Sequence, residues 1–463
     1  SSDVCSSDLN YIPMKLLTSI LLAAVFSFQF AVAQAPKIHS FTLDQALEYA
    51  MQNNYDVIYS EKNIEAAKQQ MREATAIGLP QLDGALDYSY NIQLPVNVIP
   101  GDAFPGGDPN QPLEIQFGTK NNVNAGLYLN QLLFSGKYIV GLQTAKIFME
   151  KASIDFFKDK VAVRQQVANS YYDVLALQEA KRVVDTTLAV TQVLANETKL
   201  TYEVGFAEDV DVDQLELLVV DLEASQVNIS NQLNIANAYL KFFLGLDETD
   251  SLVMMDDMLS LIEKRQNSEI IARQFKYTDN VDYASLEKQK QIRYMQVKLE
   301  KTEYMPTLLA NLNVQTNAQR DQFDFFQGGK WYPSSVFGVS LAVPIWSSGE
   351  RKARVKQAQI AYEQMEVMED QLVTTLKLQY QTALAEYYNA YTVYLNKDRA
   401  RKVAEKIFTT TSIKFREGMA SSIDILNTQT QYLEAEQNFL DASLVMLKAG
   451  EELVRLLTKT ELP

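Results

Sequence analysis

Apolar and polar residues alternate strictly in the segments that follow Pro80 and Pro306. Every second residue is apolar, and the positions between them are rich in Asn, Asp and Gln. A period of two predicts β-strands with one apolar face and one wet face. After a loop, each strand is followed by a second alternating segment, so the chain is predicted to contain two pairs of strands. The alternating segments begin near Leu82, Val123, Leu308 and Phe337.

Very long helices are predicted after the strand pairs. The segments from Gly136 to Gly205 and from Gly349 to Gly418 contain no proline, and at 1.5 Å per residue each predicts roughly 100 Å of helix. Beyond each turn, apolar residues recur in steps of three and four, which is typical of a coiled-coil seam. The seams run through Val212, Leu215, Val219, Leu222, Gln226, Ile229, Leu233 and Ala236, and through Ile423, Leu426, Thr430, Leu433, Gln437, Leu440, Leu444 and Leu447.

This arrangement occurs twice. The tripeptide Asn-Tyr-Asp at 54–56 recurs as Asn-Val-Asp at 280–282, and other short motifs recur at nearly constant separation. The number of residues that separates matching motifs changes only once, within a loop rich in Pro and Gly. This pattern is typical of one structural unit used twice. We expect a first structural repeat at 34–250, an equatorial linker at 251–280 and a second repeat at 281–463.

Each repeat is predicted to open with a helix. A capping-box pattern begins at Thr42, and the first helix is predicted to run on to about Gly78. Proline ends a helix because it lacks an amide donor and forces its predecessor toward extended geometry. The helix–strand junctions are predicted at Pro80, Gly136, Pro306, Pro344 and Gly349.

The N-terminal segment predicts a leader. Residues 14–33 carry a basic start, an apolar stretch and a small-residue cleavage pattern, so we expect a signal peptide and a mature chain that begins at Gln34. Residues 1–13 fit no part of a signal peptide and are interpreted as a mis-assigned start or a sequencing artefact. The only cysteine, Cys5, lies there, which leaves the expected mature chain without a thiol, a disulfide or a lipid-accepting cysteine.

Composition narrows the classes of function. The formal net charge is −16 with a pI near 4.7, which argues against a nucleic-acid partner. After the leader no apolar run reaches the ~18 residues of a spanning helix, so the chain is either soluble or a membrane barrel. The sequence has one histidine, His39, expected to be solvated, and it shows no catalytic set, phosphate-binding loop or metal-ligand spacing. We therefore expect no enzyme activity, no cofactor and no metal site.

The strands and helices together suggest an assembly. Four strands cannot close a barrel, and an open sheet edge cannot lie in lipid, so three chains pooling twelve strands are the simplest closed barrel. Helices of roughly 100 Å would continue it as a tube. A small soluble sheet and an elongated coiled coil remain alternatives for these patterns. The loop aromatics Phe323, Phe325, Phe326, Trp331 and Tyr332 are either membrane anchors or loop packing.

The chain resembles the TolC-type outer-membrane efflux proteins from about Phe41 to Leu457. The motifs that carry the resemblance are Val343-Pro344-Ile345-Trp346-Ser347-Ser348-Gly349-Glu350-Arg351, Val204-Gly205 with Asp211, and Phe415-x-x-Gly418-x-x-Ser421-x-x-Asp424-Ile425-Leu426. The resemblance implies an α+β membrane protein, in which a trimeric twelve-stranded barrel continues as a coiled-coil tunnel through the periplasm. It implies a homotrimer in the outer membrane of a Gram-negative bacterium, docked to a periplasmic adaptor and an inner-membrane transporter.

The resemblance also assigns roles at the helical turns. It implies a periplasmic constriction at Asp424 and Asn427, with Asp211 and Phe415 at positions that help to close the turns. Phe415, Ala420 and Asn427 depart from the family's tyrosine, arginine and second aspartate. Adaptor docking is implied at Val204, Gly205, Phe206, Gly418, Met419 and Ser421. Asp209 and Asp213 are interpreted as helix-capping residues, whereas Asp424 is interpreted as a pore residue.

The leading hypothesis is the exit duct of a tripartite efflux system. The outer-membrane component of a type I protein secretion machine and a metal-efflux variant are alternatives of the same class. A structural or adhesive trimeric coiled coil without a conducting path is the alternative of another class, and the polar face of all four strands argues against it.

Overall fold

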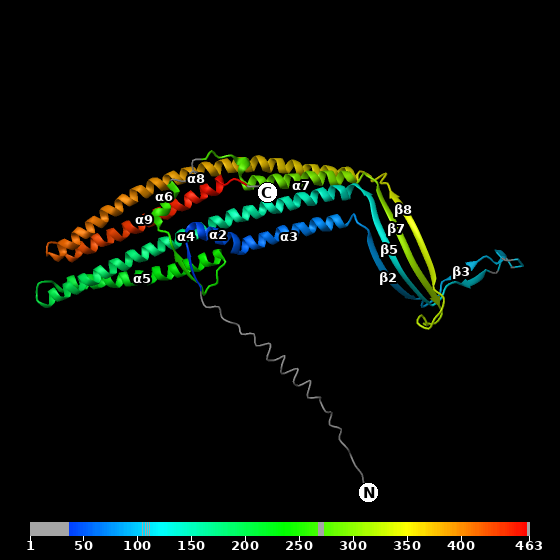
Figure 1. The fold of residues 1–463 in the computed structure, drawn as a ribbon, viewed down its shortest axis with the longest axis horizontal. Helices are drawn as coiled ribbons and strands as arrows, with labels where there is room; N and C mark the ends of the chain where they lie inside the picture. The colour runs from blue at the N-terminus through cyan, green and yellow to red at the C-terminus, as the bar shows by residue number, and fades with distance from the viewer. Residues whose placement is uncertain are drawn as a thin grey trace, which may run out of the picture.

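The computed structural model describes residues 37–103, 105–106, 108, 110, 112–266 and 273–460. The expected signal peptide and Cys5 lie outside the described residues. The molecule is elongated, with long helices side by side over most of its length and four long strands continuing from one end (Figure 1).

The elements follow the predicted order in both halves. The helices are α2 (Leu43–Asn53), α3 (Tyr55–Ala76), α4 (Gly136–Glu203), α5 (Asp209–Leu244), α6 (Met258–Gln266), α7 (Val281–Thr302), α8 (Glu350–Arg416) and α9 (Ser422–Leu457), with short 3-10 turns at Gly101–Ala103 and Tyr277–Asp279. The strands are β1 (Ile38–Phe41), β2 (Gln81–Tyr90), β3 (Val96–Ile99), β4 (Leu113–Gln116), β5 (Asn121–Ser135), β6 (Ser251–Met254), β7 (Thr307–Arg320) and β8 (Tyr332–Ala342). The helix α4 has 68 residues and α8 has 67, which confirms the predicted long helices. In the described part of the chain, no helix combines the length and the apolar character needed to cross a bilayer.

The first helix is not continuous, and the predicted run from Thr42 to Gly78 was wrong. The backbone of Asn54 is extended, and its side chain caps α3 by accepting hydrogen bonds from the amides of Asp56 and Val57. The Asn54 amide group also donates to the carbonyl of Phe243 at 2.8 Å. Asn280 begins α7 in the same way, so the repeated tripeptide marks a buried helix cap in each half.

The four long strands form one antiparallel sheet in the order β2-β5-β7-β8. The register aligns the alternation across all of them. One set of residues paired across the four strands is apolar in every strand. The neighbouring set, which lies on the other face of the sheet, is largely polar. The apolar row is Leu82, Leu129, Leu312 and Phe337, and polar residues on the other face include Asp83, Asp87, Asn124, Asn313 and Asn317. The sheet therefore has one apolar and one polar face, as predicted.

The loop between β2 and β5, rich in Pro and Gly, is not wholly irregular. Its described residues include the antiparallel hairpin of β3 and β4, which projects beyond the end of the long sheet (Figure 1). The short runs Val96–Ile99 and Leu113–Gln116 gave too little alternation between the surrounding prolines to predict strands.

The long helices form a single layer. Toward the turns, α5 packs on α4, α4 on α9 and α9 on α8, and α5 also contacts α9. Toward the sheet, α3 and α7 take the places of α5 and α9, so α4 and α8 run through both halves of the layer. The main apolar core lies where the two arrangements meet and contains fully buried side chains of Tyr171, Leu240, Leu244, Met446 and Leu447.

The predicted linker packs across this level of the helix layer. β6 pairs in parallel with β1, and the hydroxyl of Tyr171 donates to the carbonyl of Phe41 at 3.0 Å. Arg265 of α6 donates to Tyr172 at 2.9 Å and pairs with Glu451 of α9, whose side chain is 2% exposed. Burial in this network raises the pKa of Tyr172 to about 12. The linker is therefore held to both α4 and α9.

Candidate functional site at the helical turns

The two turns at the far end of the helix layer are built alike. Gly205 and Gly418 both adopt left-handed backbone conformations, with φ of 81° and 70°. The amide after each glycine donates across the turn, from Phe206 to the carbonyl of Thr201 at 3.0 Å and from Met419 to that of Lys414 at 2.8 Å. This is the Schellman arrangement, which satisfies the last carbonyls of a helix and needs glycine at its left-handed position. Each turn therefore reverses the chain tightly between two long helices.

The return helices start with acidic capping residues. The Asp424 carboxylate accepts hydrogen bonds from the amide and hydroxyl of Ser421, at 2.9 and 2.7 Å. These bonds, the hydroxyl's above all, lower the pKa of Asp424 from its ordinary value. The Asp211 carboxylate accepts from the amide of Glu208 at 3.3 Å. The capping box of α5 pairs Glu208, at the N-cap, with Asp211. Asp209 also lies in the first turn, where an acidic side chain favours the helix dipole, whereas Asp213 lies beyond that turn.

The first hairpin (α4 and α5) and the second hairpin (α8 and α9) are joined at the turns. Ser422, which is 3% exposed, donates a hydrogen bond to Asp211 and contacts Gln214 at 2.8 Å. Arg416 forms an ion pair with Glu197 at 3.4 Å. Because each contact joins one hairpin to the other, separating the hairpins would break both. We call this pair of contacts the hairpin latch.

A second buried contact joins the two hairpins farther from the turns than the hairpin latch. Thr191 of α4 donates to Gln429 of α9 at 3.1 Å, and both residues are 1% exposed. The Gln429 amide nitrogen is buried without a hydrogen-bond partner. An unmade hydrogen bond in an apolar seam destabilises the packing around it. The seam between the hairpins therefore contains one polar layer that costs stability.

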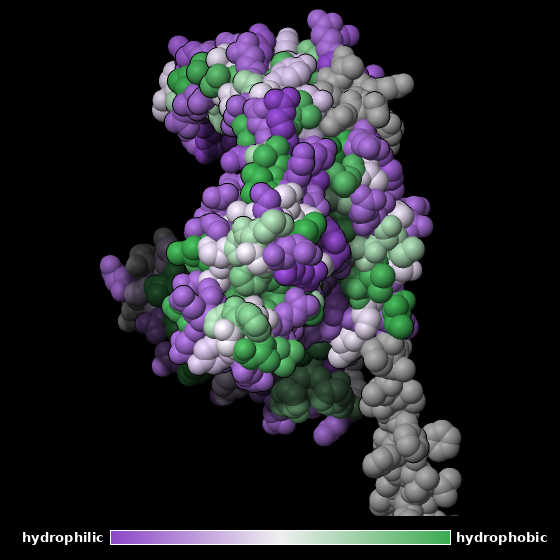
Figure 2. Space-filling model, turned by 90° about the vertical axis from the view of Figure 1, so that its left-hand side faces the viewer, coloured by the Kyte–Doolittle hydropathy of each residue, from purple (hydrophilic) through white to green (hydrophobic). Residues whose placement is uncertain are grey.

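An open groove separates the two turns beside the latch. It has a volume of about 1050 Å³ and is lined from both hairpins, including by Asp211, Phe415 and Ser421. Around it the turns carry exposed apolar side chains, with Phe206 85% and Met419 69% exposed and Val204 also exposed. Figure 2 views this end of the molecule and shows apolar patches among polar side chains. The turns of this chain therefore expose apolar side chains to solvent.

The site residues expected from the sequence fall at these turns. Asp211 and Phe415 lie together in the groove, whereas Asp424 and Asn427 are exposed on the first turns of α9. Ala420, at the position of the family's arginine, also lines the groove. The sequence analysis missed Ser422, the residue that bonds to Asp211. Its only signal is its place after the Ser421 cap, which does not reveal a contact with the other hairpin.

The junction residues lie where helices and strands meet. Pro80 and Pro306 stand between α3 and β2 and between α7 and β7, and Gly136 begins α4. A side chain at Gly136 would collide with Met305 and Thr302. Pro344 and Gly349 lie between β8 and α8, and Gly349 has a φ of 90°.

Chemistry-bearing residues elsewhere are structural. His39 is not solvated as expected, because its ring stacks on Phe41 and its Nε2 lies 3.2 Å from an oxygen of Asp250. The described residues contain no group of three or more His, Cys, Asp or Glu side chains that could hold a metal ion.

Comparison with known proteins places this architecture in a family. A family model described as outer membrane efflux protein matches residues 46–246 and 280–459. Outer membrane protein TolC of Vibrio cholerae is 21% identical over 326 residues, which cover 69% of this chain and 73% of that protein. The pyoverdine export outer membrane protein OpmQ of Pseudomonas putida is 21% identical over 429 residues, which cover 90% and 85%. The CmeC outer membrane channel of Campylobacter jejuni has the same fold, with a TM-score of 0.68 and 15% identity over 90% of this chain and 85% of that one.

The family model spans most of the chain and matches on both sides of the linker. Its match confirms the resemblance expected from the motifs, and the shared architecture confirms the expected fold of strands continued by a helical tunnel. The protein is located in the outer membrane. The chain belongs to the outer membrane efflux protein family.

Proposed function

We propose that this chain is the subunit of a homotrimeric exit duct in a tripartite efflux system. The duct passively conducts substrates that a periplasmic adaptor and an inner-membrane transporter deliver. The observation that carries this proposal is a pair of exposed apolar stripes, one at each edge of the helix layer.

The first stripe lies on α5. The buried residues Leu215, Leu222 and Leu240 face the rest of the protein. At 100° per residue, a second set of apolar residues falls on the opposite face of the helix, and all of its members are exposed. These residues are Val210, Leu217, Val220, Val227 and Phe242.

The second stripe lies on α8. Its buried face contains Leu376, Ala383 and Tyr394, which pack within the chain. The opposite face carries exposed apolar residues, and this stripe extends farther from the turn than the stripe on α5 does. These residues are Val367, Leu378, Tyr388, Val403 and Ile407.

Both stripes are apolar, and they lie at opposite edges of the helix layer. α5 and α8 are the outermost helices of the layer, so α5 of one copy meets α8 of the next. Such a heterologous contact gives a ring when the rotation closes after a whole number of copies, and an open filament when it does not. A water-exposed monomer would leave both stripes unburied, which soluble surfaces rarely tolerate.

The sheet supports the same assembly. β2 and β8 are its open edges, and open edges are not tolerated in lipid. Three copies provide twelve strands, enough for a closed barrel with an aqueous bore. The row that contains Leu82 and Phe337 then faces lipid, and the row that contains Asp83 and Asn313 faces the bore.

The helical turns are the end that receives the adaptor. Val204, Phe206 and Met419 offer exposed apolar contacts around the groove, and Gly205 and Gly418 allow the tight turns that present them. Ser421 lines the same groove. In a trimer, Asp424 would contribute one carboxylate per subunit to a ring that favours cations, with Asn427 one turn above.

The proposal is tested by dye accumulation in a deletion strain. Cells without the gene should accumulate ethidium, and the wild-type gene should restore efflux. A double Phe206→Asp, Met419→Asp variant should reach the outer membrane as a trimer without restoring efflux, because its turns no longer offer apolar contacts. A Val227→Ile variant, which preserves an apolar side chain away from the turns, is the control. Unchanged accumulation in the deletion strain, with no redundant gene present, would contradict the proposal.

A further inference from the structure

The helix layer has one covered face and one open face at the level of the linker. On α4, Tyr171 and Tyr172 point to the covered face, where they bond to Phe41, Asp256 and Arg265. At 100° per residue, Asp173 and Leu177 project from the opposite side of α4. In the proposed duct the linker must lie outside, because on the inner face it would obstruct the bore. The inference below therefore rests on the proposed function, which turns the open face toward the bore.

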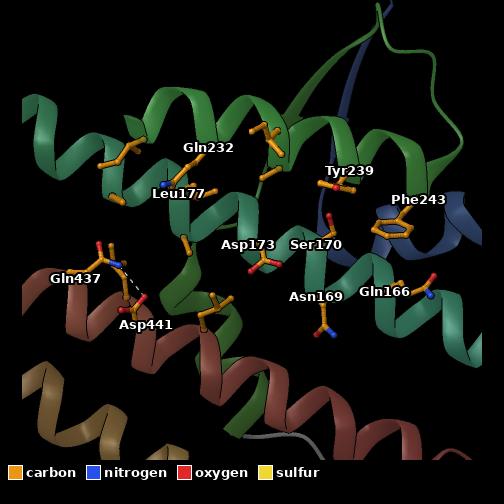
Figure 3. A pocket seen from close by; sticks show the side chains of 17 residues that line it. Gln166, Asn169, Ser170, Asp173, Leu177, Gln232, Tyr239, Phe243, Gln437 and Asp441 are labelled. Carbon is orange, nitrogen blue, oxygen red and sulfur yellow. Dashed lines mark hydrogen bonds between the residues drawn. The ribbon is translucent and has the colours of Figure 1, made fainter. Parts of the chain in front are cut away.

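A cavity of about 650 Å³ opens on this face between α4, α5 and α9 (Figure 3). Volumes of this size suit drug-sized organic molecules. Most of its wall is apolar and comes from all three helices. The larger apolar side chains are Leu177, Ile229, Ile235, Tyr239, Phe243, Leu440 and Leu444.

Two carboxylates, those of Asp173 and Asp441, lie among the amide and hydroxyl groups of the cavity. Asp173 is neutralised by Lys448, whose Nζ lies 2.7 Å from its carboxylate. Asp441 accepts a hydrogen bond from the neutral amide of Gln437 at 3.0 Å, so its negative charge is not neutralised by that contact. The Oδ1 atom of Asn169 is buried without a hydrogen-bond partner. A cationic group would compensate the charge of Asp441, and an N–H donor placed at Asn169 would satisfy its oxygen.

We infer that this cavity is a binding subsite for amphipathic organic cations in the inner wall of the duct. The apolar body of the ligand packs against Tyr239, Phe243 and Leu444, and its cationic group lies beside Asp441. A trimer carries three such subsites. Weak, repeated binding along the wall lets a molecule enter and leave, as conduction through a pore requires.

Equilibrium binding of rhodamine 6G to the purified trimer in lipid nanodiscs tests the inference. Fluorescence anisotropy should show saturable binding, and Asp441→Asn should weaken it roughly tenfold through loss of a charge-assisted contact. Glu223→Gln removes the same charge from α5 away from the cavity and should leave binding unchanged. Ala236→Phe, which fills the cavity without altering charge, should also abolish binding. A neutral BODIPY dye of similar size should bind the wild type more weakly than rhodamine 6G.

Two results would overturn the subsite. One is equal rhodamine affinity in the wild type and Asp441→Asn. The other is the absence of saturable binding to a wild-type trimer that conducts ions in a planar bilayer, which would leave the proposed function standing. Failure of the proposed function is seen separately, as a protein that neither forms trimers nor conducts.

Discussion

Ser422, in the first turn of α9, donates its hydroxyl hydrogen bond to Asp211, in the first turn of α5. The two residues lie 211 positions apart and belong to different hairpins. Asp211 also accepts the amide of Glu208 that starts its own helix. One carboxylate thus caps its own helix and holds the neighbouring hairpin, which makes the starting geometry of α5 dependent on the position of α9.

Breaking the hairpin latch should open the duct. Ser422→Ala removes the hydroxyl bonded to Asp211 and Gln214, and it should increase the mean single-channel conductance of the trimer in a planar bilayer. Adding Arg416→Ala, which removes the ion pair with Glu197, should increase it further. The control is Ser230→Ala, because that hydroxyl bonds to the backbone of its own helix. Equal conductance of Ser422→Ala and wild type would place the closed gate elsewhere.

The carboxylate of Asp424 should govern block by divalent cations. Asp424→Asn should weaken block by Mg²⁺, because the ring of three charges is lost. The Ser421 bonds lower the pKa of Asp424 from its ordinary value, so the carboxylate should keep its charge to a lower pH than a free aspartate would. Block should therefore persist to a lower pH than a free aspartate would allow. It should fade only as the pH drops through the lowered pKa of the folded protein.

Ser421→Ala provides the matched comparison for that pH dependence. It removes the hydroxyl bond while leaving the Asp424 charge in place, so the pKa should return toward its ordinary value and block at pH 4 should weaken. If wild-type block at pH 7 survives Asp424→Asn, the pore role of Asp424 is wrong and the residue acts as a cap alone.

The paired asparagine caps should contribute similarly to stability. Asn54→Ala removes a cap and leaves the carbonyl of Phe243 without its donor, and Asn280→Ala does the same to Leu456. Each change should lower the unfolding free energy by about 1–2 kcal/mol, seen as a lower Tm of the solubilised protein. Asn54→Asp keeps the capping acceptor but not the donor and should cost less than Asn54→Ala. Equal Tm values for all these proteins would show that the breaks in the helices do not depend on the caps.

The buried ion pair of Arg265 and Glu451 should fasten the linker to the helix layer. Glu451→Gln leaves Arg265 buried without a compensating charge and should destabilise the protein by about 3 kcal/mol. The control is Glu65→Gln, because the Lys62–Glu65 pair is exposed and such pairs contribute little. Limited proteolysis of the linker should accelerate in Glu451→Gln and not in the control. Equal cleavage rates would show that the ion pair does not hold the linker to the helix layer.

The sequence predicted the elements whose patterns repeat over many residues. Period-two alternation around Leu82 and Leu308 persisted long enough to predict both strands and faces, and the absence of proline predicted α4 and α8. The break at Asn54 was missed because a single cap does not disturb helical spacing on either side of it. The motif did repeat at Asn280, and an asparagine followed two residues later by aspartate was the available signal.

Contacts between segments that are far apart in the sequence could not be predicted from the sequence. Nothing near Ser422 indicates that its hydroxyl reaches Asp211, because the contact depends on how two hairpins pack. The exposed stripes on α5 and α8 were present in the sequence, for example at Leu217 and Val403. The stronger apolar seam on the opposite face of each helix made these stripes hard to recognise. The exposure of the side chains in the structure is needed to tell a stripe that packs within the chain from one that faces a neighbouring chain.

The most direct test of the central claim, that three copies close edge to edge, is cysteine cross-linking in native membranes. Leu217 on α5 and Ile407 on α8 lie at similar distances from the turns and are 61% and 43% exposed. Leu217→Cys with Ile407→Cys should give covalent trimers on oxidation. Leu217→Cys with Glu405→Cys, on another face of α8, should not. Covalent trimers would establish that α5 of one copy packs on α8 of the next, whereas monomers alone, or equal cross-linking in the control, would contradict the ring and with it the proposed duct.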